Sequence, residues 1–130
     1  MVEKLSRASG AKTMKKDKTT ATERLLGRVV KATELVQYQE GAIVSRAVID
    51  KKAGTVTAFA FDEGEGLSEH TAPYDALIYI LEGTLEVTIA GEGMLVSAQE
   101  LVVMPANKPH ALRAVTKCKM LLVMIREKSR

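Results

Sequence analysis

The chain has 130 residues, of which 46% are hydrophobic and 27% charged, so it is long enough for one domain with a core and has a globular composition. Its longest apolar runs, residues 76–81 and 120–125, hold six residues each and exclude a membrane-spanning helix. The first residues lack the apolar stretch of a signal peptide, and the one cysteine, Cys118, excludes an internal disulfide. We therefore expect a cytoplasmic protein with no membrane partner.

The net charge of +3 is divided unevenly along the chain. Residues 1–20 hold six basic and two acidic side chains, whereas residues 21–130 hold 13 basic and 14 acidic ones. We predict a basic flexible tail over residues 1–20, because this stretch is polar and shows no hydrophobic period, and a single folded domain over residues 21–130. A nearly neutral domain argues against nucleic acid as a partner.

From about residue 25 onward, short runs rich in Val, Ile and Leu alternate with turn residues. Residues 20–36 carry only a weak signal for a helical turn, and residues 62–66 form an acidic loop with two glycines. Strands are expected at residues 42–49, 56–61, 76–81, 85–90, 94–97, 101–104, 111–115 and 120–125. Eight short strands separated by frequent turns predict an all-β sandwich or barrel.

The chain contains two histidines, His70 and His110, and their surroundings are informative. With this spacing the sequence resembles the cupin superfamily, whose two motifs read G-x5-H-x-H-x3-E-x6-G and G-x5-P-x-G-x2-H-x3-N. The residues that match motif positions are Gly64, His70, Gly83, Pro105 and His110. The resemblance covers roughly residues 40–126. It implies an all-β double-stranded β-helix, the jelly-roll barrel of small RmlC-like cupins, with a pocket inside and a dimeric state.

The chain departs from both motifs at the positions that bind metal. Full-site cupins hold a divalent metal, such as Fe, Mn, Ni or Zn, through two His and a Glu of the first motif and one His of the second. Here Ala72 stands at the second histidine and Ala76 at the glutamate, so the resemblance leaves only His70 and His110 as ligands. Three further motif positions are replaced, at Gln99, Asn107 and Ala114. Asparagine at a glycine position is tolerable, because it accepts a left-handed backbone better than most residues.

Two imidazoles alone fall short of a metal site, because a first-row divalent cation takes three or four protein donors. Tight binding would need a substitute carboxylate. Asp75 lies next to the lost glutamate position, but in a regular strand it would face the opposite way unless Pro73 breaks the strand. Asp75 and Glu69 are therefore the candidates for a third ligand beside His70 and His110.

The two histidines could also work without a metal, or be ordinary residues at a loop edge and in a strand. Both occupy ligand positions of the motifs, which favours a retained role in a pocket, and a neutral imidazole can donate, accept or shuttle a proton. Counting by twos places Leu112 on the face of His110, and Ile78 on the face of Ala76. The expected ligand-binding residues are His70, His110, Tyr74, Ala72, Ala76, Ile78 and Leu112.

These residues predict a small protein that binds a small molecule in its barrel pocket, with weak or no catalytic activity. The second hypothesis is a metal-dependent enzyme of the dioxygenase, isomerase, decarboxylase or cyclase type with an atypical site at His70 and His110. A third, a nucleic-acid-associated protein using residues 1–20, is weakened by the charge of the domain. Exposed strand edges and the apolar strand at residues 120–125 predict a homodimer.

Overall fold

The computed structural model describes residues 24–126, which form nine β-strands and one short 3-10 helix. The predicted basic tail lies outside the described residues. In chain order the elements are η1 (Ala32–Glu34), β1 (Ile43–Lys51), β2 (Gly54–Phe61), β3 (Gly66–His70), β4 (Ala76–Glu82), β5 (Thr84–Ile89), β6 (Glu92–Ser97), β7 (Leu101–Met104), β8 (His110–Ala114) and β9 (Cys118–Ile125). Within this part of the chain, no helix has the length and apolar character to cross a membrane.

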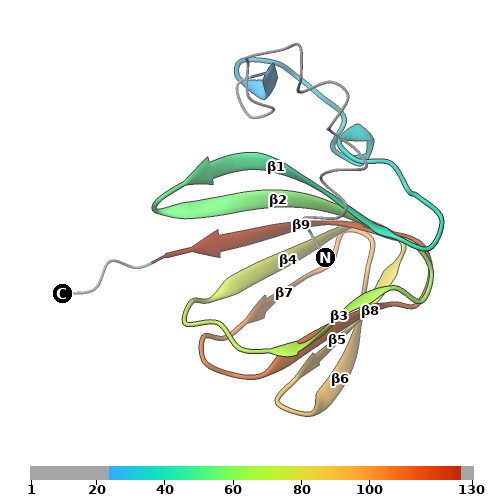
Figure 1. Cartoon of the computed structure of the whole chain (residues 1–130), viewed down its shortest axis with the longest axis vertical. Coiled ribbons are helices and arrows are strands. Elements are labelled where there is room, and N and C mark those ends of the chain that lie inside the picture. Colours follow the sequence, from blue (N-terminus) through green and yellow to red (C-terminus); the bar gives the residue numbers. More distant parts are fainter. Residues whose placement is uncertain (1–23, 127–130) are drawn as a thin grey trace.

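The strands make two antiparallel sheets that face each other (Figure 1). Sheet A has the order β1-β2-β9-β4-β7, and sheet B has the order β3-β8-β5-β6. Strand β9 lies between β2 and β4 in sheet A, and β8 lies between β3 and β5 in sheet B, so both sheets pair strands that are distant in sequence. The predicted all-β barrel is therefore confirmed.

Two of the differences from the strands predicted from sequence have a clear local reason. Strand β3 was not predicted: it has five residues, lies at the edge of sheet B and exposes its last three side chains, so it lacks an apolar period. Strand β6 begins at Glu92 rather than at residue 94. The hairpin turn is the pair Ala90 and Gly91, both left-handed with φ of 50° and 87°, which is the geometry of a tight two-residue turn.

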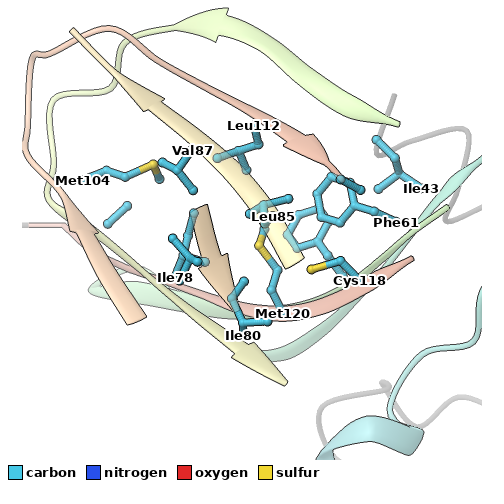
Figure 2. Close-up of a cluster of buried hydrophobic side chains, with 14 residues drawn as sticks. Ile43, Phe61, Ile78, Ile80, Leu85, Val87, Met104, Leu112, Cys118 and Met120 are labelled. Carbon is cyan, nitrogen blue, oxygen red and sulfur yellow. The ribbon is translucent and has the colours of Figure 1, made fainter. Parts of the chain in front are cut away.

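The core lies between the two sheets and is mostly aliphatic (Figure 2). Side chains alternate along each strand, so one face of each sheet points inward, and β4 shows this with its buried residues at every second position. The predicted inward positions Ala76, Ile78 and Leu112 all belong to this core. Figure 2 shows Met104 and Phe61 at opposite ends of the cluster, with Ile78, Ile80, Leu85, Val87 and Met120 between them.

Residues 24–42 pack against the outer face of sheet A on the side of β1 (Figure 1). Leu35 and Val36 contact Val44, Ala58 and Ala60, which are the outward-facing residues of β1 and β2. A second, smaller apolar cluster therefore covers part of the sheet that would otherwise be open to water.

Polar contacts attach the same segment to the sheet. The Lys119 ammonium is buried, donates a hydrogen bond of 2.6 Å to the Thr33 carbonyl and lies 4.9 Å from the Tyr38 ring centre. The Tyr38 hydroxyl donates a hydrogen bond of 2.6 Å to Glu82.

The one cysteine, Cys118, belongs to the core between the sheets. Burial raises the pKa of its thiol to about 12, so this group is neutral at pH 7 and serves packing.

Two residues that stand at glycine positions of the motifs have a left-handed backbone. Gln99 and Asn107 have φ of 69° and 65°, so both replace glycines at positions that need this conformation. Gly83 also has a positive φ, of 84°. A Cβ at Gly83 would collide with the Lys117 carbonyl oxygen and lie 2.8 Å from the Cys118 Cα, so the turn and β9 approach too closely for a side chain.

Replacing Gly83 with alanine should therefore destabilise the protein more than the matched change Gly91→Ala. Both glycines are left-handed, at 84° and 87°, but Gly91 has open space around a new Cβ. Gly91→Ala should cost about 1–2 kcal/mol from backbone strain, and Gly83→Ala should cost a further ~1–3 kcal/mol from the collision. Urea unfolding followed by circular dichroism measures both, and equal losses in the two variants would contradict the steric argument.

Candidate functional site

The structure brings the two histidines together at one end of the barrel. His70 is the last residue of β3 and His110 the first of β8, and the register of these strands pairs the two residues directly. Their rings meet edge to face, with centroids 4.4 Å apart and planes at 71°. The sequence predicted both positions, and the strand pairing explains why residues 40 positions apart in sequence are in contact.

Each ring is held by a backbone carbonyl two residues earlier. The Nδ1 of His70 lies 3.0 Å from the Ser68 oxygen, and the Nδ1 of His110 lies 3.2 Å from the Lys108 oxygen. A carbonyl oxygen can only accept a hydrogen bond, so Nδ1 carries the proton in both rings. In the neutral form each Nε2 then has a free lone pair, which can accept a hydrogen bond or bind a metal.

Solvent exposure differs between the two rings. His70 is exposed, whereas His110 is only 5% exposed, so the pair lies at the boundary between water and the core. Burial lowers the pKa of His110, and the charge of a protonated His70 lowers it further, against the opposing effect of its hydrogen bond to Lys108. His110 is therefore neutral at pH 7.

Two loops at this end are fixed to each other and present His110. The Asn107 N–H donates to the Ala72 carbonyl and the Ala106 N–H donates to the Asp75 carboxylate, both at 2.8 Å. The left-handed backbone at Asn107 turns the chain so that these contacts form. The Asp75 side chain, predicted as a candidate ligand, therefore holds a turn beside the site.

The described residues do not gather three donors into a metal site. Between residues 24 and 126, no group of three His, Cys, Asp or Glu side chains is placed to hold an ion. Asp75 precedes β4 and its Oδ1 is bonded to the Ala106 amide, while Glu69 is an exposed neighbour of His70 at an irregular part of β3. The hypothesis of a third carboxylate ligand therefore receives no support from the geometry.

The predicted apolar wall is continuous with the core. Ala76, Ile78 and Leu112 have exposures of 4%, 0% and 5%, and they pack among other core side chains. Tyr74, on the loop between β3 and β4, is half-buried with its ring 5.9 Å from the Arg126 guanidinium carbon. The ligand-binding roles of these four residues and of Ala72 stay predictions.

The strand register places Glu92 in line with the two histidines, a position that the sequence did not predict. Ile89 pairs with His110 on one side and with Glu92 on the other, so the two histidines, Ile89 and Glu92 form one row across sheet B. All four lie on the face that points toward sheet A, with about 10 Å between the Cα atoms of His110 and Glu92. Recognising the two-residue turn at Ala90 and Gly91 would have placed Glu92 in this row.

A hollow of about 430 Å³ lies on the other side of sheet B, away from the core. The polar residues that line it, such as Glu86 and Arg113, alternate along β5 and β8 with the residues that face the core. Arg113 and Glu86 form an exposed ion pair at 3.2 Å. The residues that line it are Gly64, Gly66, Leu67, Ser68, Glu86, Thr88, Ala111, Leu112 and Arg113. Neither histidine lines this hollow, so it is separate from the predicted pocket.

Comparison with known proteins decides the family. Residues 58–125 match the family described as Cupin domain, which is more than half of the chain. The chain is a cupin. This confirms the resemblance on which the two histidine motifs were aligned, and with it the jelly-roll fold of the two facing sheets.

Solved structures agree with this assignment. A conserved protein of unknown function from Streptococcus pyogenes is 34% identical, with a TM-score of 0.76 over 79% of this cupin and 90% of that chain. A cupin superfamily protein from Desulfitobacterium hafniense is 25% identical, with a TM-score of 0.74 over 78% and 93% of the chains. A cupin 2 conserved barrel domain protein from Leptotrichia buccalis is 39% identical, with a TM-score of 0.70 over 72% and 46%. None of the curated proteins compared with the chain matches it.

The lowered pKa of His110 should make this cupin less stable in mild acid. The unfolded chain takes up a proton near the ordinary pKa of 6.5, whereas the folded chain does so only at lower pH. Stability attributable to His110 is therefore complete above about pH 6.5 and is lost as the pH falls from there through the lower pKa of the folded protein. Urea unfolding at pH about 7 and about 5 should show a larger loss for the wild type than for His110→Gln. Equal losses would contradict the assignment, and His70→Ala should raise the pKa of His110 measured by NMR.

Proposed function

We propose that this cupin binds a small, uncharged organic molecule at the histidine end of its barrel and has weak or no catalytic activity. The observation that carries the proposal is the pair of adjacent imidazoles whose Nδ1 atoms are both bonded to backbone carbonyls. With both protons placed on Nδ1, each Nε2 is a hydrogen-bond acceptor, and the two rings that carry these atoms are adjacent. A ligand with two nearby hydroxyl or amide N–H groups would satisfy both.

The charge state of His110 supports an uncharged ligand. Burial and the nearby His70, whose ring centre is 4.4 Å away, lower the pKa of His110, so this ring is neutral at pH 7. The surrounding inward side chains are apolar, with Ile89 beside His110 in the same row and Ala76 and Met104 packed in the core. A partly apolar molecule that donates hydrogen bonds fits this combination of groups.

A metal-dependent enzyme is the second candidate, and the same two lone pairs favour it. Two neutral imidazoles would leave most coordination positions of a divalent cation to water and would bring no negative charge. The structure gathers no third donor within residues 24–126. We therefore place ligand binding ahead of metal chemistry.

The deciding experiment combines metal analysis with ligand screening on the wild type, His70→Ala and His110→Ala. Glu69→Ala is the matched control, because Glu69 is exposed and adjacent to His70 on β3 but carries no imidazole. We expect far less than one equivalent of Fe, Mn, Ni or Zn in the purified wild type. A screen of small polyhydroxy and amide compounds by thermal shift should find one that stabilises the wild type and Glu69→Ala. Each histidine variant should bind it at least about tenfold more weakly.

A different result would favour the enzyme. Near-stoichiometric metal in the wild type and in Glu69→Ala, lost from both histidine variants, would overturn the proposal. A ligand that still binds with full affinity after both histidines are replaced would place the binding site elsewhere, with the outer hollow of sheet B as the next place to look.

A further inference from the structure

The hollow on the outer face of sheet B exists because small residues stand where other strands carry side chains. Its volume of about 430 Å³ lies within the range of about 300–1,000 Å³ that is typical of ligand sites. Ala111 on β8 contributes only a methyl group, and Gly64 and Gly66 contribute no side chain on the β3 side. A Cβ at Gly66 would collide with the Leu112 carbonyl oxygen, so the two strands approach too closely there for a larger residue.

Polar side chains surround this open space. The strand register pairs Ala111 with Thr88 on β5, and it pairs Arg113 with Glu86 on the same two strands. Ser68 lines the hollow from β3, which lies on the other side of β8 (Figure 1). The hollow therefore combines a carboxylate, a guanidinium and two hydroxyl groups around a floor of small residues.

The ion pair leaves part of each charged group available. Arg113 donates from Nε and Nη2, at 3.3 and 3.2 Å, to the same Oε1 atom of Glu86. Within the described residues, neither the Glu86 Oε2 nor the Arg113 Nη1 has a hydrogen-bond partner in the protein. The two side chains are 57% and 37% exposed, so both groups meet water. A ligand can therefore donate to Oε2 and accept from Nη1 while the pair stays intact.

The two charges favour a ligand that carries both signs. Among the described residues that line the hollow, Glu86 and Arg113 are the charged ones, so the net charge is zero and an ion of either sign gains no net attraction. A zwitterion makes two charge-assisted hydrogen bonds, which are each about twice as strong as neutral ones. A neutral molecule would make only the weaker kind, in an exposed hollow that no aromatic side chain lines.

We propose that the outer hollow of sheet B binds a small zwitterion of the class of free α-amino acids. The ligand carboxylate accepts hydrogen bonds from Arg113, and the ligand ammonium donates to Glu86. An α-amino acid carries both charges on one carbon, which matches a guanidinium and a carboxylate that are in contact. The Thr88 and Ser68 hydroxyls lie beside the pair and can bond to the remaining polar atoms. The site is on the opposite side of sheet B from the histidine pair and does not depend on its function.

The test titrates isotope-labelled protein with L-alanine and with two analogues that each lack one charge. Propionate lacks the ammonium group, and ethylammonium lacks the carboxylate. L-Alanine at about 50 mM should shift the backbone amide NMR signals of Thr88, Ala111 and Arg113, because a small exposed site implies a Kd in the millimolar range. Each analogue should bind at least about tenfold more weakly, because it loses one of the two charge-assisted hydrogen bonds.

Substitutions of the ion pair locate the site. Arg113→Gln and Glu86→Gln should each weaken the binding of L-alanine at least about tenfold, with unchanged far-UV circular dichroism. Lys52→Gln is the matched control for the loss of a positive charge, because Lys52 is exposed on the turn between β1 and β2, away from sheet B. This variant should bind L-alanine as tightly as the wild type.

Several results would overturn the proposal. L-Alanine that shifts none of the lining signals would leave the hollow without a zwitterion site. Propionate that binds as tightly as L-alanine would make it an anion site of Arg113 alone, and stronger shifts with glycerol would indicate a neutral polyhydroxy ligand. An equal loss of affinity in Lys52→Gln would also contradict it. The comparison of L-alanine with its analogues uses only the wild type, so it decides the matter even where a variant fails to fold.

Discussion

The structure depends on the packing of aliphatic side chains between two sheets whose strands come from distant parts of the chain. Ile78 and Ile80 from sheet A meet Leu85 and Val87 from sheet B, and all four are fully buried. The chain has only two Phe and no Trp, so burial of branched and unbranched aliphatic groups supplies most of the hydrophobic free energy. This packing holds β3 and β8 in the position that brings the two histidines into contact.

The site at the end of the barrel pairs two adjacent imidazole rings, while alanine replaces the metal ligand at two motif positions. Ala72 and Ala76 stand where the resemblance expects a histidine and a glutamate, and Ala76 is buried in the core. The turn before His110 is nevertheless held in place. The Asp75 carboxylate accepts a hydrogen bond from the Ala106 N–H, and Asn107 has a left-handed backbone. The barrel therefore presents two imidazoles, and within residues 24–126 no third His, Cys, Asp or Glu side chain joins them in a group that could hold an ion.

The two faces of sheet A show how one sheet can serve two purposes. Its inner face closes the barrel, while its outer face binds residues 24–42 on the β1 side and remains apolar on the β7 side. The buried Lys119 lies against Tyr38 and donates a hydrogen bond to the Thr33 carbonyl. It therefore attaches residues 24–42 to the outer face of sheet A at β9. An uncovered aliphatic face has a cost in water.

The sequence by itself determined the all-β class, most strand positions and the inward residues of β4 and β8. It also singled out His70 and His110 as a candidate pair. Alternation and motif spacing are local properties of the chain, so both can be read without the tertiary structure. The edge strand β3 was missed, because its exposed polar residues have no apolar period, and β6 was started two residues late. Only the tertiary structure decided that Asp75 caps a turn, that Glu92 shares a row with His110, and that the outer face of sheet A is apolar across five strands. Each of these depends on which strands are neighbours, and strand order is set by packing between residues far apart in sequence.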